Sequence, residues 1–182
     1  MSDILEAGRR AGHACWIEQR LFETLGSWVA DAARSAEPAL SRMLAEHAHH
    51  HAWHAELWRD RLPELAEHPP ADAVRPRHEA AVELVDTLSS VDGTVERLVG
   101  VYRVLLPRLA DEYDAQLQAT SPLTDGPTAR VLKLCLADLH DDRSEGEATL
   151  RSLIDSPEVA ATAHAREVAL ETLAAAANGL TS

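Results

Sequence analysis

Residues 46–58 of the chain read EHAHHHAWHAELW and hold five of its ten histidines. On an α-helix, side chains three and four positions apart lie on one face. His47, His51 and His54 therefore share a face of the predicted helix. The same face carries the apolar residues Leu40, Met43, Leu44, Trp58, Leu62 and Leu65. This pattern predicts a helix that directs imidazole rings toward the protein interior.

Two further histidines of this stretch lie elsewhere on the predicted helix, His50 at the edge of the apolar face and His49 on the opposite side. A buried imidazole needs a partner, because burying an unpaired polar group destabilises the folded state. We therefore expect the functional site at the inward-facing histidines.

The composition favours a single all-α domain. The chain has 182 residues, enough for a substantial core, and 46% of them are hydrophobic. Ala, Leu, Glu and Arg dominate, and these residues favour helix. The residues that favour strands, such as Ile, Thr, Tyr and Phe, are sparse.

The formal net charge of −13 argues against nucleic acid as a partner, because phosphate recognition needs clustered cations. It equally argues against docking on an anionic membrane surface. The acidic start of the sequence, MSDILE, lacks the apolar segment of a signal peptide, and no apolar run approaches the roughly 20 residues that span a bilayer. Cys15 and Cys135 are expected to be buried thiols on helices. We expect a cytoplasmic protein.

Caps and breakers divide the chain into helical segments. Asp3 is a suitable N-cap for the first helix, and Pro38 opens the second after a short turn. Three prolines between residues 66 and 78 exclude a regular helix there, and Pro107 is expected to kink a later helix. The predicted helices span 3–34, 38–65, 79–88, 94–119, 127–154 and 157–177.

This organisation predicts a four-helix bundle with an added C-terminal helix. Its parts are a hairpin over 3–66, a crossover with a short helix over 67–92, a second hairpin over 93–155 and the C-terminal helix over 157–178.

Acidic residues are expected to meet the histidines inside this bundle. Glu18 and His54 each lie 18 positions from residue 36 in the first turn, so an antiparallel hairpin brings them together. Asp138, Asp142 and Glu145 are spaced four and three apart near the middle of the fourth long helix, and we expect them to face inward. The alternative for these three acids is a solvated helix face.

Imidazoles facing carboxylates have two physical interpretations. The first is a metal site, because these ligands suit iron, manganese or zinc and a bundle interior presents ligands from several helices. The second is a metal-free network of imidazolium–carboxylate pairs. The candidate metal ligands are Glu18, His47, His51, His54, Asp138, Asp142 and Glu145.

The two hairpins, the crossover and the inward acids and histidines resemble the ferritin-like superfamily. The stretches 51–58 and 121–150 are similar to small ferritin-like proteins of bacteria, and the resemblance covers most of residues 5–155. It implies a helical bundle around a metal centre. Iron is the first candidate cofactor, with manganese, zinc or no metal as alternatives.

The motif set of the di-iron members is incomplete in this chain. Those members carry Glu, Glu-x-x-His, Glu and Glu-x-x-His on successive long helices. Glu18 matches the first element, whereas Glu46 and His49 spell the second but face away from the apolar side. Glu112 lies on the flank of the third helix, and residues 138–141, Asp-Leu-His-Asp, replace the last motif. The departures argue against iron storage and favour a divergent centre.

Three functions remain open. The resemblance implies an oxidase or oxygenase that acts on a small organic substrate. A metal-independent isomerase, cyclase or dehydratase would instead use His51, His54, Glu18 and Asp142 as acid–base groups. The third possibility is a non-catalytic ligand-binding or interaction bundle.

The C-terminal helix carries apolar positions that can cover the bundle or join a homodimer. They are Val159, Ala163, Val168 and Leu173.

Overall fold

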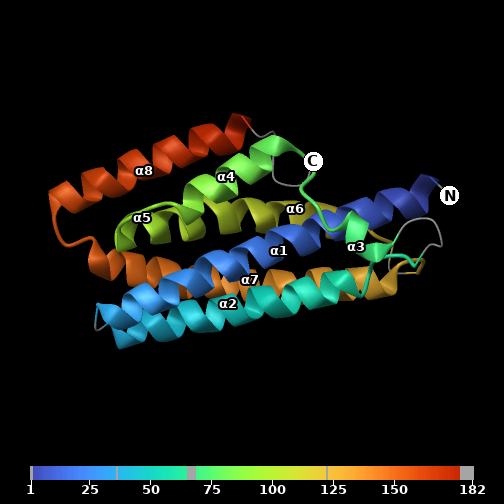
Figure 1. Cartoon of the computed structure of the whole chain (residues 1–182), viewed down its shortest axis with the longest axis horizontal. Coiled ribbons are helices and arrows are strands. Elements are labelled where there is room, and N and C mark those ends of the chain that lie inside the picture. The colour runs from blue at the N-terminus through green and yellow to red at the C-terminus, as the bar shows by residue number, and fades with distance from the viewer. Residues whose placement is uncertain (1, 36, 65–68, 122, 177–182) are drawn as a thin grey trace. The chain divides into compact units, whose positions relative to one another are not determined.

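The computed structural model describes residues 2–35, 37–64, 69–121 and 123–176, and every regular element among them is helical (Figure 1). The helices are α1 (Ser2–Arg34), α2 (Pro38–Arg59), α3 (Pro70–Ala73), α4 (Glu79–Ser89), α5 (Thr94–Val99), the π-helix η1 (Gly100–Leu105), α6 (Leu106–Ala119), α7 (Gly126–Leu153) and α8 (Pro157–Ala176). The all-α prediction is confirmed. Within the described ranges, no helix combines the length and apolar character that crossing a membrane requires.

The chain divides into two compact units. The first contains the described residues of 1–77 and 119–134, and the second contains those of 78–118 and 135–176. A single domain over the whole chain stays a prediction. Each unit is described by itself below.

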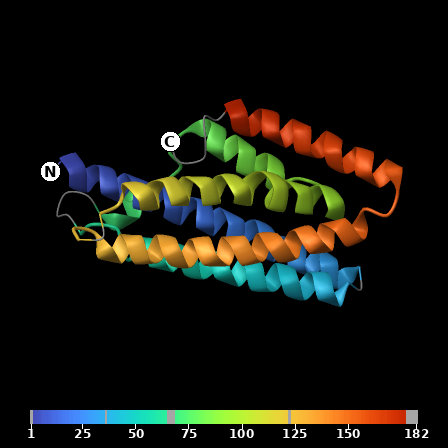
Figure 2. The same ribbon diagram turned by 180° about the vertical axis from the view of Figure 1, so that it is seen from behind.

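In the first unit, α1 and α2 lie side by side (Figures 1 and 2). The prediction of paired helices in this region is confirmed, although Ala36 of the turn lies outside the described residues. Pro38 occupies the first turn of α2, where its missing N–H leaves no hydrogen bond unmade. The two helices bury facing apolar residues, which are Ile17, Leu21, Leu25, Leu40, Met43 and Leu44.

The second helix is shorter than predicted. We expected it to reach residue 65, but α2 ends at Arg59. Pro63 has no N–H to donate to the carbonyl of Arg59, and its ring disfavours the helical conformation at Leu62. Leu62 is nevertheless buried, whereas Leu65 lies outside the described residues.

The proline-rich segment contains one short helical turn, α3, where we expected no regular helix. Pro70 opens this turn, and a proline is compatible with the first turn of a helix. α3 contacts α1. The backbone of Ala73 approaches Gly12 so closely that a Cβ atom at Gly12 would lie 2.0 Å from the Ala73 carbonyl oxygen.

In the second unit, the helix predicted over 94–119 is observed as α5, η1 and α6 in succession. π-helical turns come just before Pro107, where Leu106 N–H bonds to the carbonyl of Val101 five residues earlier, and the kink expected at Pro107 stays a prediction. Pro107 cannot donate to the carbonyl of Arg103, so the regular α-helical pattern is interrupted there in any case.

Helix α8 packs beside α4, α5 and η1 in this unit (Figures 1 and 2). Its buried residues are Ala163, Leu170 and Ala174. Val168 of the predicted apolar face is half exposed, at 50%, so it does not help to cover this unit, and a role of the face in a homodimer stays a prediction. Two arginines join α8 by ion pairs, since Arg103 contacts Glu167 at 3.4 Å and Arg108 pairs with Glu171. The predicted end of the helix near residue 178 lies outside the described residues.

Candidate metal centre

The centre lies between the two long helices of the first unit. Glu18 comes from the middle of α1, and His51 and His54 come from α2. The two histidines are three positions apart, so the helix brings both rings to the side that faces α1. The prediction that Glu18 lies beside His54 is confirmed, and Glu18 also contacts His51.

Both imidazoles direct Nδ1 toward the same carboxylate oxygen. His51 Nδ1 lies 2.5 Å from Glu18 Oε2, and His54 Nδ1 lies 3.4 Å from it. The two rings meet edge to face at a centroid distance of 5.9 Å. All three side chains have 0% exposure, so water does not screen the interactions between them.

Electrostatics keep the buried carboxyl group ionised. Burial by itself raises the pKa of Glu18, because it removes the charged form from water. The positive charges that His54 and His51 carry when protonated, together with hydrogen bonds from both rings, outweigh that effect and lower the pKa to about 2. The centre is therefore built to hold positive charge against a buried carboxylate.

His51 Nε2 is buried and has no hydrogen-bond partner among the described residues. An unsatisfied buried nitrogen costs about 1–3 kcal/mol. Such groups are rare in folded proteins and mark sites where a water molecule, an ion or a ligand completes the structure. The orphaned nitrogen thus marks this region as incomplete when only protein atoms are considered.

The three residues also fit the spacing of metal ligands. Each offers one ligand atom, and these atoms all lie within 4.8 Å of one another. Two atoms bound about 2.1 Å from one ion lie about 3.0 Å apart at an octahedral angle and about 3.4 Å apart at a tetrahedral angle. The Glu18–His54 separation of 3.4 Å meets this requirement directly. The Glu18–His51 separation of 2.5 Å is that of a short hydrogen bond, so binding of an ion requires these two atoms to move apart by about 0.5 Å.

The burial of the remaining histidines of α2 agrees with the sequence pattern. His47 is buried, His50 is partly buried and His49 is exposed. His47 and His50 stack with ring centroids 6.3 Å apart. The group of converging ligand atoms does not include His47, which sits one turn before His51. Its role as a ligand stays a prediction.

The predicted acidic residues of α7 lie in the second unit and differ in burial. Asp142 is buried and Asp138 partly buried, whereas Glu145 is exposed. The inward orientation expected for Glu145 is therefore wrong, because the inward face of α7 runs through Leu139, Asp142 and Gly146. Membership of the three acids in the centre stays a prediction.

The surroundings of Asp142 in the second unit include a buried tyrosine. Tyr102 is 1% exposed, and burial, followed by the charges of Asp142 and Glu145, raises its pKa well above the usual range. Its ring lies directly over Gly146, where a Cβ atom would be 2.4 Å from two ring carbons. The sequence pattern predicts Tyr102 as a core residue whose phenol could reach the site, and the signal for its packing on α7 is the glycine four positions after Asp142.

Cys15, which the sequence predicts only as a buried thiol, is a neighbour of the centre. Cys15 precedes Glu18 by three positions and therefore lies on the same face of α1. Its Sγ donates a hydrogen bond of 3.3 Å to the carbonyl of Ala55, the residue after His54. Burial raises the pKa of this thiol, which keeps it protonated beside the centre.

Comparisons of the chain with models of protein families, with curated proteins and with solved structures found no significant match.

Proposed function

We propose that this protein binds one divalent transition-metal ion through Glu18, His51 and His54. The observation that carries the proposal is the convergence of three ligand atoms within 4.8 Å, all from fully buried side chains. A buried salt bridge alone is weak support for stability, because desolvation offsets much of the attraction between the charges. A contribution to stability therefore explains the buried cluster of Glu18, His51 and His54 less well than a role in binding does.

The donor set indicates the class of metal. Two imidazoles and one carboxylate suit iron, manganese and zinc, and a site with two nitrogens and one oxygen leaves coordination positions for other molecules. Iron remains the first candidate. When bound, such an ion supplies Lewis acidity and, for iron or manganese, one-electron redox chemistry.

The residues of the chain itself prepare the site for this role. The carboxylate of Glu18 provides the negative charge that offsets a dication, and its low pKa keeps that charge present at neutral pH. Complete burial of the three side chains excludes bulk water and strengthens every electrostatic interaction among them.

We further propose that the chain is a divergent ferritin-like bundle with oxidase or oxygenase activity on a small organic substrate. The order of its segments supports this assignment: a pair of long helices, a connection with short helices, and two further long helical segments. Ligands projecting from long helices into a buried centre are the arrangement that such bundles use. A cytoplasmic location is part of the same proposal.

A metal-independent acid–base enzyme is the competing proposal, and the short contact between His51 and Glu18 favours it. A hydrogen bond of 2.5 Å joins the two groups, and hydrogen-bonded carboxylate–imidazole pairs transfer protons in many enzymes. The two proposals differ in whether an ion displaces the proton of this hydrogen bond.

Isothermal titration calorimetry of untagged protein with Zn²⁺ and Mn²⁺ tests the proposal. We expect saturation at about one ion per chain and release of about one proton, read from the dependence of the enthalpy on the buffer. His54→Ala should weaken binding by at least about a hundredfold, and Glu18→Gln, which keeps the hydrogen-bond acceptor and removes the charge, by at least about tenfold.

His49→Ala is the matched control, because it removes an exposed histidine from the same helix. It should bind metal like the wild-type chain. Equal weakening in His49→Ala and His54→Ala would show adsorption to the histidine-rich surface. An absence of saturable binding, with the His51–Glu18 hydrogen bond still visible by NMR, would favour the acid–base proposal.

A further inference from the structure

A second site lies in the first unit, where the proline-rich segment approaches the first turns of α1. Gly8 and Gly12, one helical turn apart on α1, permit this approach. A Cβ atom at Gly8 would lie 3.0 Å from the ring of Pro63, and one at Gly12 would overlap the backbone of Ala73. The two glycines therefore permit Pro63 and Ala73 to lie close against α1.

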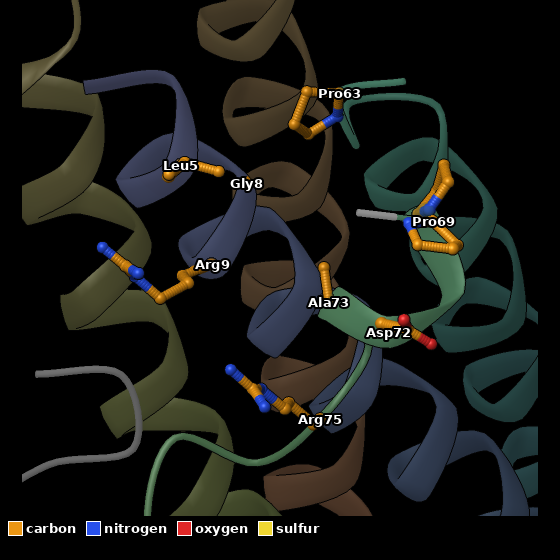
Figure 3. Close-up of a pocket in the computed structure, with 9 residues that line it drawn as sticks. Leu5, Gly8, Arg9, Pro63, Pro69, Asp72, Ala73 and Arg75 are labelled. Carbon is orange, nitrogen blue, oxygen red and sulfur yellow. The ribbon is translucent and has the colours of Figure 1, made fainter. Parts of the chain in front are cut away.

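This approach leaves two cavities that share Arg9, Ala73 and Arg75. The first, of about 340 Å³, is walled mainly by apolar groups (Figure 3). Its other lining residues are Leu5, Gly8, Pro63, Pro69, Pro70 and Asp72. The second, of about 370 Å³, is more polar, with Glu6, His13, Pro76 and Arg77 in its wall. Both volumes are in the range of small-molecule sites.

Arginines are concentrated around these cavities, although the chain as a whole carries a net charge of −13. The carboxylate of Glu6 is contacted by Arg9 at 3.0 Å, Arg77 at 3.6 Å and Arg10 at 3.9 Å. One carboxylate cannot neutralise three guanidinium groups. Arg75 adds a fourth, and it has no ion pair or hydrogen bond to any residue that the structure describes. Asp72 in the wall of the first cavity brings the carboxylates to two, so the four arginines still leave an excess of positive charge.

Figure 3 shows Arg9 and Arg75 extending toward the same side, with Pro63 and Pro69 on the opposite side of the first cavity. The shared wall thus places two guanidinium groups next to an apolar, proline-lined space. Proline rings are rigid, so this space loses little conformational freedom when a ligand fills it.

The second cavity has a fixed polar wall. His13 is 2% exposed, stacks on Trp16 and accepts a hydrogen bond of 3.0 Å at Nδ1 from the backbone N–H of Arg77. Accepting at Nδ1 leaves the ring proton on Nε2 in the neutral imidazole. This contact holds the backbone at Arg77 in place, two residues after Arg75.

We propose that this site binds a small organic anion with an apolar body, whose carboxylate or phosphate group lies between Arg9 and Arg75. Guanidinium groups match these anions with paired hydrogen bonds. The apolar body occupies the proline-lined cavity. Arg9 and Glu18 are nine residues apart on α1, or about 14 Å along the helix axis, so the anion site is distinct from the metal centre.

Straight-chain anions probe this proposal directly. Butanoate, octanoate and octyl phosphate are titrated into metal-free protein in a chelator, at low ionic strength, with the Nε–Hε signal of Arg75 observed by NMR. We expect saturable binding with one ligand per chain. Each methylene that enters the apolar cavity contributes about 0.8 kcal/mol, which corresponds to about a fourfold lower Kd. Comparison of octanoate with octyl phosphate shows which anionic group is preferred.

Arg75→Gln should weaken octanoate and octyl phosphate by at least about tenfold, because it removes a charge-assisted hydrogen-bond pair. Arg42→Gln is the control, since Arg42 is exposed on α2 of the same unit and the substitution changes the net charge equally. It should leave the Kd unchanged. The proposal is overturned if no probe saturates, if Arg75→Gln binds like the wild-type chain, if Arg42→Gln weakens binding equally, or if octanoate binds no tighter than butanoate. Because the titration contains no metal, its result does not depend on whether Glu18, His51 and His54 bind an ion.

Discussion

Replacing Gly146 by alanine tests how Tyr102 packs on α7. Two opposing effects decide the outcome. In a helix interior, alanine is favoured over glycine by about 1 kcal/mol. Against this, the new Cβ would lie 2.4–2.5 Å from three carbons of the Tyr102 ring, which is 1% exposed and has little room to move. Overpacking of this kind costs about 1–3 kcal/mol, and a contact this short falls at the upper end. We expect a net loss of about 1–2 kcal/mol.

Gly26→Ala provides the matched control, because Gly26 also lies inside a helix and its Cβ would meet no atom within 4 Å. That variant should gain about 0.5–1 kcal/mol. In urea titrations followed by circular dichroism, the midpoints of the two variants should differ by about 1 M, for a denaturant slope of about 2 kcal/mol per M. If Gly146→Ala is as stable as Gly26→Ala, the ring does not rest on α7 as described.

Three further outcomes are expected. The pKa of Glu18 is lowered from 4.5 to about 2, so its contribution to stability is present above about pH 4.5 and is lost as the pH falls through about 2. Over that interval, urea titrations should show the wild-type chain losing about 3 kcal/mol more than Glu18→Gln. Arg103→Met removes the ion pairs of Arg103 with Glu147 and with Glu167 of α8. It should cost about 1–2 kcal/mol, with faster hydrogen exchange in α8, whereas Arg143→Met at an exposed position should cost less than about 0.5 kcal/mol. Cys15 is buried with a raised pKa, so a thiol reagent should modify it only on unfolding; labelling of the native protein at the rate of a free thiol would contradict its burial.

The pairing of α1 with α2, and the contact of Glu18 with the histidines of α2, could be predicted from local information. Periodicity of 3.6 residues correctly separated the buried His51 and His54 from the exposed His49. Counting outward from the turn placed Glu18 beside them, because paired antiparallel helices advance by the same rise per residue. These inferences need only helix geometry and one turn position.

Features that depend on contacts between distant segments were missed. Periodicity alone did not predict the burial of residues at the edge of the inward face of a helix. Glu145 is an example, because a small rotation of α7 moves such a residue from the inward side to the solvent side. Pro63 is a local signal for the early end of α2. The apolar residues that follow Arg59 favoured a longer helix in the prediction. The arginine-lined cavities require Gly12 to meet Ala73, and no local periodicity specifies that approach.

The central claim, an ion held by Glu18, His51 and His54, is tested most directly by anomalous diffraction from crystals of untagged protein, recorded at the iron, manganese and zinc edges. The expected result is one anomalous peak about 2.0–2.3 Å from a carboxylate oxygen of Glu18 and from one imidazole nitrogen of each histidine. Crystals grown with these metals that show no peak within bonding distance of the three side chains would contradict it.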